Sequence, residues 1–212
     1  MELRGRVALV TGAGRRLGRA LAQALAQRGM TVALHYHQSE DGARALEQEI
    51  QRAGGRAACF QADLTDAHAA EELPRQVAAR MGGLAVLVNS AAIMQRLRLE
   101  DTTPEQWDAI LGLNLRSVFF CTRGAAPALR EARGKVVNLA DLAGLEPWPA
   151  FAAHSISKAG VVMLTKVLAR SLAPEVTVNA IAPGAIDTPM LRGALEQMIP
   201  NHDHLFEGVR GM

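Results

Sequence analysis

Residues 6–18 read RVALVTGAGRRLG, a short apolar run that leads directly into a glycine-rich turn. We expect the run to form a buried strand and a helix to open at the end of the turn, Thr11–Gly18. Small residues let the backbone approach a pyrophosphate, whose charge can be held by free N–H groups and the positive end of the helix. A tight strand-to-helix connection would also use such glycines, so the turn alone leaves both interpretations open.

The rest of the chain repeats the pattern of this first unit. Short apolar runs alternate with amphipathic segments of helical periodicity that are rich in Ala, Leu, Gln and Arg. Runs that are apolar throughout are typical of a parallel sheet covered by helices on both faces. We therefore predict an α/β fold: a single doubly wound, Rossmann-like domain with about six parallel strands and its ligand outside their carboxyl ends. The expected strands are Arg6–Val10, Thr31–Tyr36, Arg56–Gln61, Leu84–Val88, Lys135–Leu139 and Val176–Ile181.

Composition and charge exclude several other classes of protein. The chain has 212 residues, of which 49% are hydrophobic, and its formal net charge is only +2 with dispersed Lys and Arg. This is typical of one globular domain and lacks the basic stripe that nucleic-acid binding needs. Cys59 and Cys121 stand far apart, which argues against a disulfide framework or a zinc site. With no signal-peptide pattern and no apolar run near the ~18 residues of a membrane span, we expect a cytoplasmic protein without a membrane partner.

The turn and several later motifs resemble those of short-chain dehydrogenases/reductases. Thr11–Gly18 is similar to that family's T-G-x-x-x-G-x-G turn, with Arg16 at the middle glycine. Three further motifs fall in the family's order: LVNSAA at 87–92 resembles L-V-N-N-A-G, Asn114 its helix asparagine, and PGAIDT at 183–188 its P-G-x-x-x-T. Several weak motifs at consistent spacing make a specific match, and the similarity runs from Arg6 to about Met190.

The closest resemblance is to the pteridine-reductase-like branch of that family. Its members have an arginine at the turn and segments comparable to LHYHQS at 34–39 and QADL at 61–64. Pteridine reductases stack their pterin on an aromatic side chain just after the L-V-N-N-A segment, where this chain has Ile93 and Met94. A pterin is therefore not the expected substrate. With few aromatic residues, of which Trp148 and Phe151 are nearest, the pocket should be aliphatic and suit a small carbonyl compound or an acyl-type ketone.

The predicted cofactor is NADP(H). NAD enzymes of this fold place an acid after the second strand to accept the ribose hydroxyls, but no acid precedes Glu40 here. Arg16, His37 and Ser39 can instead donate to a 2′-phosphate, although a polar strand end and a solvated helix start would look the same. A metal at His35 and His37 is disfavoured because no third ligand lies nearby. By resemblance, Asp63 would bond the adenine and Asn89 would lie beside the ribose. The predicted cofactor-binding residues are Gly12, Arg15, Arg16, Leu17, Gly18, His35, His37, Gln38, Ser39, Asp63, Leu64, Asn89, Ala91, Lys158, Pro183, Gly184, Ile186 and Thr188.

The family's catalytic Y-x-x-x-K motif corresponds to HSISK at 154–158. One helical turn places His154 and Lys158 on the same face. In the family this lysine binds the nicotinamide ribose and lowers the tyrosine pKa. A histidine has an ordinary pKa of about 6.5 and could exchange the proton itself. The alternative is a helix-surface histidine in an inactive relative.

Asp141 stands thirteen residues before His154, at the position of the family's serine. Pteridine reductases likewise have an aspartate there, and an Asp–His pair could serve as the acid/base. By resemblance, Asn114 would hold a water on the proton path. The alternative is a polar residue that bonds the backbone of a buried helix. The predicted catalytic residues are Asn114, Asp141, His154 and Lys158.

These motifs lead to one predicted function and one alternative. We expect residues 1–190 to form an NADP(H)-binding oxidoreductase domain and 191–212 a short C-terminal tail that lacks the family's seventh strand, in a naturally short or truncated chain. The predicted activity is hydride transfer to a small carbonyl or imine substrate. The alternative is a non-catalytic dinucleotide-binding pseudoenzyme or sensor. As the family implies, we expect a homodimer or homotetramer formed through Pro104–Leu129 and Ala152–Ser171.

Overall fold

The structure is a computed structural model, and it describes residues 2–184 of the chain. Its six strands are all parallel and form one sheet in the order β3-β2-β1-β4-β5-β6. The elements in chain order are β1 Val7–Val10, α1 Arg16–Gln27, β2 Thr31–Tyr36, α2 Glu40–Arg52, β3 Arg56–Gln61, α3 Ala67–Met81, β4 Val86–Asn89, η1 Leu99–Asp101, α4 Pro104–Leu111, η2 Gly112–Arg116, α5 Ser117–Glu131, β5 Lys135–Leu139, η3 Leu142–Gly144, α6 Ala152–Ser171 and β6 Thr177–Ile181.

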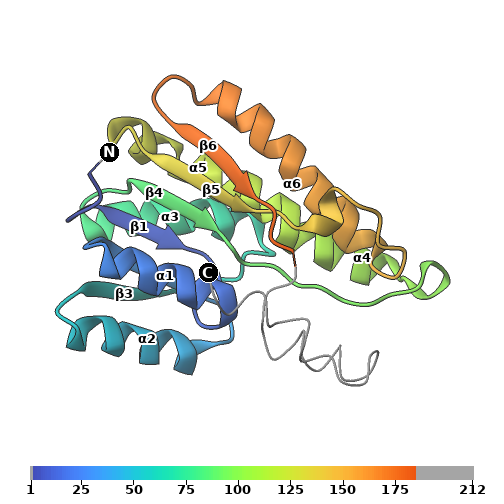
Figure 1. Cartoon of the computed structure of the whole chain (residues 1–212), viewed down its shortest axis with the longest axis horizontal. Coiled ribbons are helices and arrows are strands. Elements are labelled where there is room, and N and C mark those ends of the chain that lie inside the picture. Colours follow the sequence, from blue (N-terminus) through green and yellow to red (C-terminus); the bar gives the residue numbers. More distant parts are fainter. Residues whose placement is uncertain (1, 185–212) are drawn as a thin grey trace. The chain divides into compact units, whose positions relative to one another are not determined.

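This strand order confirms the predicted doubly wound, Rossmann-like fold. The chain leaves β1 toward β2 and β3 on one side, and β4 then begins the other half of the sheet beside β1 (Figure 1). The order of the strands therefore reverses between β1 and β4. In open α/β sheets a ligand binds outside the carboxyl ends of the strands at such a switch point.

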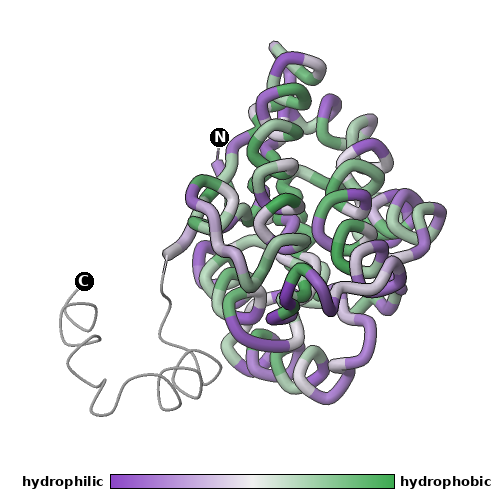
Figure 2. The backbone as a smooth tube through the Cα atoms, turned by 90° about the vertical axis from the view of Figure 1, so that its right-hand side faces the viewer, coloured by the Kyte–Doolittle hydropathy of each residue, from purple (hydrophilic) through white to green (hydrophobic). Residues whose placement is uncertain are grey.

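Two hydrophobic clusters fill the two faces of the sheet. One cluster joins the strands to α3 and α5 through side chains such as Leu73 and Leu129, and the other joins them to α1 and α2 through Ala22 and Leu46. Hydrophilic and hydrophobic residues alternate along the helices, as expected where one side of a helix faces a sheet (Figure 2). The core thus consists of three layers, with the strands in the middle.

Local sequence signals explain where several helices begin. Asp66 caps α3, since its carboxylate accepts the N–H of His68 at 2.7 Å. Thr103 and Gln106 form a reciprocal capping box at the start of α4, where Pro104 is the first helical residue. These caps fix the helices that follow β3 and β4.

The strand boundaries agree with the sequence predictions except at three strands. β1 and β6 begin one residue later than predicted, at Val7 and Thr177, and β4 spans Val86–Asn89 instead of Leu84–Val88. The prediction that β4 ends before its asparagine was wrong because Asn89 pairs directly with Asn138 of β5. An asparagine is usually a turn residue, but here its side chain has a partner inside the sheet.

A chain of polar side chains crosses the buried centre of the fold. The Asn89 amide donates to Asn138 Oδ1 at 2.8 Å, and the Asn138 amide donates to Thr165 Oγ1 of α6 at 2.9 Å. The Asn89 amide also lies 3.3 Å from Thr122 Oγ1 of α5. These bonds satisfy polar groups that would otherwise be buried without partners.

The first compact unit of the chain extends to Ala182. The predicted boundary between residues 190 and 191 lies outside the described residues. Within residues 2–184, no helix has the length and apolar character needed to cross a bilayer.

Candidate functional site

The glycine-rich turn after β1 is compact because its glycines touch other backbone. Gly12 has a positive φ of 68°, and a Cβ there would lie 3.0 Å from the Cα of Ala91 after β4. A Cβ on Gly18 would overlap the carbonyl oxygen of Gly12. Gly14 lies directly against Ser39, so the turn also reaches the start of α2. Side chains at these positions would push the turn away from its neighbours and change its compact shape.

Arg16 is the first residue of α1 and has a φ of 51°. This left-handed conformation favours glycine, the residue of the resembled motif, and is strained by about 1 kcal/mol or more for any other residue. Arg15 before it is extended and makes no side-chain bond to cap the helix, and the first turn of α1 holds no acidic side chain. The positive end of the helix is therefore not neutralised by a carboxylate.

His35 ties together the ends of the first three strands. Its Nδ1 accepts the N–H of Gly12 at 3.0 Å, and its Nε2 lies 3.1 Å from the carbonyl oxygen of Ala62. Burial lowers the pKa of His35 to about 4, so the ring is neutral and donates from Nε2. Both ring nitrogens are engaged inside the protein. His35 was predicted to bind the cofactor, but it has no donor left for a phosphate and instead holds the turn in place.

The residues directly after β2 carry no carboxylate before Glu40. His37 and Gln38 are exposed, and Ser39 is half-buried beside the turn. Glu40 is the first acid in this segment, and its carboxylate accepts the hydroxyl of Tyr36 at 3.0 Å and pairs with Arg44 at 3.4 Å. These two partners hold Glu40 within its own helix and strand.

Asp63 lies just after β3 and is held by the loop that follows. Its Oδ1 accepts the N–H and the hydroxyl of Thr65 at 2.9 and 2.7 Å, and these hydrogen bonds lower the pKa of its carboxyl. Its Oδ2 lies 3.9 Å from Nε2 of His37. Leu64 beside it is buried. The adenine contact predicted for Asp63 stays a prediction.

Thr11 connects the glycine-rich turn to the end of β4. Its Oγ1 accepts the N–H groups of Ser90 and Ala91 at 2.9 and 3.0 Å. The two predicted motifs are therefore joined by side-chain hydrogen bonds. Asn89 is buried, and its amide group is engaged with Asn138 and Thr122. Its predicted place beside the cofactor ribose stays a prediction.

Asn114 lies in the π-helical turn between α4 and α5. Its Oδ1 accepts the N–H of Ile93 at 2.9 Å, and its amide donates to the Ile93 carbonyl at 2.9 Å and to Ser157 Oγ at 3.1 Å. Nδ1 of His154 lies 3.4 Å from the same amide. Asn114 thus bonds the backbone of the loop after β4, not that of a helix as the alternative interpretation had it, and it also contacts the predicted catalytic histidine.

Asp141, His154 and Lys158 come together at the carboxyl end of β5. Nε2 of His154 lies 3.6 Å from Oδ2 of Asp141, a distance for electrostatic attraction rather than a normal hydrogen bond. Oδ1 of Asp141 accepts the N–H of Ala143 at 2.8 Å, which fixes the carboxylate. Burial raises the pKa of the Asp141 carboxyl, but the His154 ring, the Ala143 N–H and the Lys158 charge outweigh it, so the pKa lies below its usual value.

Lys158 is buried and donates to the carbonyl oxygen of Leu139 at 2.6 Å. Burial lowers the pKa of its ammonium group to about 8, and the Asp141 carboxylate opposes part of that shift. Lys158 therefore remains mostly charged near neutral pH. The predicted positions one helical turn apart do place His154 and Lys158 on the same side of α6.

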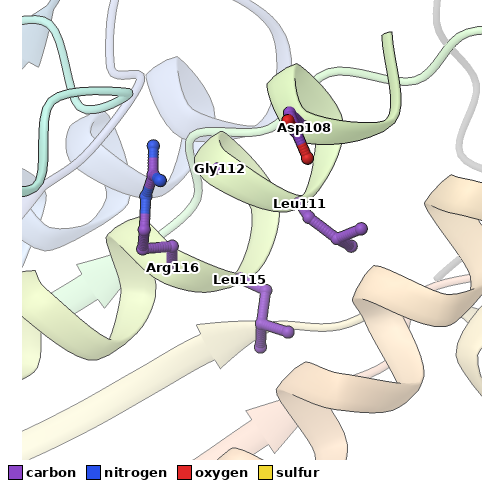
Figure 3. A pocket seen from close by; sticks show the side chains of 5 residues that line it. All are labelled: Asp108, Leu111, Gly112, Leu115 and Arg116. Atoms are coloured by element: carbon purple, nitrogen blue, oxygen red, sulfur yellow. The ribbon is translucent and has the colours of Figure 1, made fainter. Parts of the chain in front are cut away.

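A surface hollow of about 360 Å³ lies on the outer side of the π-helical turn (Figure 3). Five residues line it: Asp108, Leu111, Gly112, Leu115 and Arg116. Arg116 is held there by a hydrogen bond of 2.6 Å to the carbonyl of Thr65. No predicted catalytic residue lines this hollow, so the candidate site rests on the contacts described above.

Two loops meet beside Asp141. Leu97 follows β4, and its N–H donates to the carbonyl of Ala150 at 2.9 Å, while Leu97 and Phe151 form an isolated parallel bridge. Trp148 and Phe151 pack edge to face with ring centres 6.0 Å apart. The segment from Asp141 to Phe151 is thereby joined to the loop after β4.

Some predicted residues have no described role, and some residues with a role were missed. Pro183 and Gly184 follow the first unit in the chain, and Ile186 and Thr188 lie outside the described residues, so their cofactor contacts stay predictions.

The sequence analysis missed Thr11 and Asn138, which organise the turn and the sheet. The signal was available for Asn138, a single amide inside the apolar run of β5.

Comparison with known proteins gives consistent matches over most of the chain. A family model described as short chain dehydrogenase matches residues 6–199. A 3-oxoacyl-(acyl-carrier-protein) reductase of Synechocystis sp. is 40% identical over 190 residues, which are 89% of this chain and 77% of that protein. The 3beta-hydroxysteroid dehydrogenase 1 of Eggerthella lenta is 37% identical over 211 residues, covering 94% of this chain and 81% of its own length.

A solved structure extends this similarity to three dimensions. It is a short chain dehydrogenase from Burkholderia cenocepacia in complex with NADP, with a TM-score of 0.85 and 38% sequence identity. The match covers 90% of this chain and 78% of that one. Neither of the two curated relatives above is a pteridine reductase, so the resemblance to that branch stays a prediction.

Proposed function

This chain belongs to the short-chain dehydrogenase family, and from that premise we propose that it is an oxidoreductase that binds NADP(H) and transfers hydride to a carbonyl or imine substrate. When bound, the nicotinamide supplies the hydride. The protein's part is to bind and orient the two reactants and to handle the proton. The observation that carries the proposal is the meeting of the glycine-rich turn and the Asp141–His154–Lys158 cluster at one edge of the sheet.

The topology supports a dinucleotide across that edge. The turn follows β1, Asn89 ends β4 and Asp141 follows β5, and all three strands are parallel neighbours. Their carboxyl ends flank the switch point at which such sheets bind ligands. The glycines let the turn pack closely on Ala91 and Ser39, and a turn of this compact kind lets the backbone approach a pyrophosphate. Lys158, a buried charged donor, would hold the nicotinamide ribose.

The charged side chains around β2 support a preference for NADP(H), the cofactor that carries a 2′-phosphate. Glu40, the first acid after β2 in the sequence, is engaged with Tyr36 and Arg44. Arg16 is kept in a strained conformation that glycine would adopt freely. A strained residue at a predicted phosphate site indicates that its side chain contributes to binding. With His37 and Ser39 nearby, we propose that NADP(H) is preferred over NAD(H).

The substrate is proposed to be a largely apolar ketone. The segment that begins at Asp141 contains Trp148 and the exposed Leu145. It is joined to the loop after β4 through Leu97 and Phe151. The relatives named above act, by their names, on 3-oxoacyl and 3β-hydroxysteroid compounds. Both classes combine a carbonyl or alcohol with an apolar body, which suits an aliphatic and aromatic rim.

A homo-oligomer formed through α5 and α6 also remains a proposal. Ile156, Met163 and Val167 are large apolar side chains exposed at helical spacing on α6, and Phe119 is exposed on α5. Surfaces of this kind are typical of association between copies. The mass of the protein in solution, measured with and without Met163→Glu, tests it.

Two measurements test the proposed function. The first is titration of the protein with NADPH and NADH, for which we expect at least tenfold tighter binding of NADPH, since a charge-assisted phosphate contact contributes ~1.5–3 kcal/mol. Arg16→Ala should remove most of that preference. Arg28→Ala is the matched control, because it removes the same charge at the far end of α1. Equal affinities for the two cofactors would contradict the proposed preference.

The second measurement is NADPH oxidation with a panel of 3-oxoacyl thioesters, ketosteroids, small ketones and cyclic imines. We expect turnover with at least one apolar ketone. Binding of NADPH without oxidation on any member would instead favour a non-catalytic dinucleotide-binding protein. Failure to bind either cofactor would refute both possibilities.

A further inference from the structure

Asp141 and His154 differ in how much of their side chains is exposed to solvent. The side chain of Asp141 is 27% exposed, whereas that of His154 is 4% exposed. Nε2 of His154 is enclosed and has no hydrogen-bond partner in the described part of the chain, although it faces Oδ2 of Asp141 at 3.6 Å. The side chain of Asp141 is therefore more accessible to a substrate entering from solvent than the imidazole of His154.

The hydrogen bonds around Asn114 determine which nitrogen of His154 carries a fixed proton. Oδ1 of Asn114 accepts the N–H of Ile93, so the orientation of the amide is settled. The two amide hydrogens of Asn114 go to the Ile93 carbonyl and to Ser157 Oγ. Nδ1 of His154, which lies 3.3 Å from the same carbonyl, is left with an acceptor and must donate to it. Nε2 is thus the nitrogen that gains or loses a proton, and it faces Asp141.

We propose that Asp141 is the catalytic residue that gives the proton to the substrate. The enclosed His154 is a positioning residue that passes this proton to Asp141 from the buried side of the carboxylate. This inference rests on the proposed function. Hydride from the nicotinamide forms the new C–H bond, and the π electrons of the carbonyl move to its oxygen. The proton on Nε2 of His154 passes to Oδ2 of the ionised Asp141, and the carbonyl oxygen takes it from there. The ketone becomes an alcohol, NADPH becomes NADP⁺, and the pair regains one proton from water at the exposed carboxyl.

The charges that face the pair explain why neither residue acts alone. In the described residues these are the pair itself and the ammonium of Lys158, while Asn114 and the Ile93 carbonyl are neutral. Because its neighbours lower the pKa of Asp141, the isolated carboxyl is ionised at neutral pH and holds no proton to give. Nε2 of His154 faces this carboxylate but is itself enclosed. Together, His154 and Asp141 can deliver a proton at the carboxylate of Asp141, the more exposed residue of the pair.

The kinetic test compares Asp141→Asn, His154→Gln and the double variant with a ketone that the wild-type protein reduces. Glutamine can still bond its neighbours but carries no transferable proton. We expect each single variant to lose about 10²-fold in kcat, with NADPH affinity and KM changed by less than about threefold. The double variant should be no slower than the slower single variant, because the two groups act in series. Ser155→Ala, which removes a neighbouring buried hydroxyl without a partner in the described residues, is the control for packing.

Three kinetic outcomes would overturn the proposal. Full kcat in Asp141→Asn with loss in His154→Gln would make His154 the direct donor. Full kcat and an unchanged pH profile in His154→Gln would show that His154 supplies no proton. Losses that multiply in the double variant would show that the two residues act independently.

A second measurement does not depend on turnover. The ¹⁵N spectrum of labelled histidines, with His154→Gln to assign the signal, should show Nδ1 of His154 protonated in its neutral form. In Asp141→Asn the amide should donate to Nε2 and keep the neutral ring protonated at Nδ1. A neutral ring protonated at Nε2 would refute the arrangement. If the wild-type protein reduces no substrate, the proposed function fails, and this spectrum still decides whether the pair shares a proton.

Discussion

Replacing Lys158 by methionine should make the folded protein more stable at neutral pH while removing its affinity for the cofactor. Burial lowers the pKa of Lys158 from the ordinary 10.5 to about 8. Each pKa unit corresponds to 1.36 kcal/mol, so the charged form destabilises the folded state by about 3 kcal/mol below pH 8. Methionine has a similar length and no charge. It leaves the Leu139 carbonyl without its donor, which costs about 1 kcal/mol, and a net gain of about 2 kcal/mol remains.

The pH dependence gives this prediction a definite sign. Between pH 8 and 10.5 the unfolded chain still binds the proton that the folded lysine has lost, so the stability of the wild-type protein should rise with pH in this window. Burial raises the pKa of Cys59 and Cys121 to about 12, so these thiols oppose the rise above their ordinary value of 9. Both proteins contain the thiols, and the difference between wild type and variant therefore isolates Lys158.

Urea unfolding at pH 7 and pH 10, followed by circular dichroism, measures the effect. We expect Lys158→Met to be more stable by about 2 kcal/mol at pH 7, equivalent to about 4–8 °C in Tm for a domain of this size. The advantage should shrink toward pH 10. NADPH titration of the same samples should show at least a tenfold weaker affinity.

Two results would refute the reasoning. A less stable Lys158→Met protein at pH 7 would show that the lysine stabilises the fold and that its burial is compensated by contacts not described here. An advantage that persists unchanged at pH 10 would show that packing, rather than the buried charge, separates the two proteins. Retained NADPH affinity would count against the assignment of Lys158 to the nicotinamide ribose.

Three further predictions concern the groups that hold the site together. Gly18→Ala should weaken binding of NADPH and NADH alike, by at least tenfold in a titration, because its Cβ would meet the carbonyl of Gly12; unchanged affinity would mean that the turn is not the cofactor site. His35→Phe should reduce the loss of stability on acidification, because the wild-type ring has a folded pKa of about 4 and destabilises the fold progressively from pH 6.5 to 4; parallel stability curves in urea would contradict this. Asn138→Ala should reduce the free energy of unfolding by about 1–3 kcal/mol by leaving Asn89 unpaired, whereas a neutral effect would show that another group replaces it.

The fold was predictable because its main signals are local. Short apolar runs identified all six strands, and their alternation with helical segments indicated a doubly wound sheet. The error at β4 arose where a long-range contact decided the outcome. Asn89 belongs to the strand because of Asn138, and no local pattern around residue 89 reveals a partner that lies far along the chain.

The sequence indicated which residues belong to the candidate site, but not how they are arranged. Helical spacing placed His154 and Lys158 on one face, and the family resemblance placed Asp141 with them; the structure brings Asp141 within 3.6 Å of His154. The sequence could not show that His154 is enclosed and Asp141 accessible, since exposure depends on how η3, α6 and the loop after β4 pack together. His35 was predicted among the cofactor-binding residues for a similar reason. Sequence shows that a histidine ends a strand, but only the structure shows where both of its nitrogens point.

The polar chain through Asn89, Asn138 and Thr165 also restricts how the sheet can be misassembled. Shifting β5 by one residue against β4 would turn Asn138 to the opposite face and separate it from both partners. Each polar group buried without a partner costs about 1–3 kcal/mol, so such a misaligned sheet would lose much of the 5–15 kcal/mol that stabilises a typical domain. Apolar strands alone tolerate slippage, because one valine replaces another. The two amides at matching positions therefore destabilise a shifted alignment and favour the native pairing of β4 with β5, which joins the two halves of the sheet.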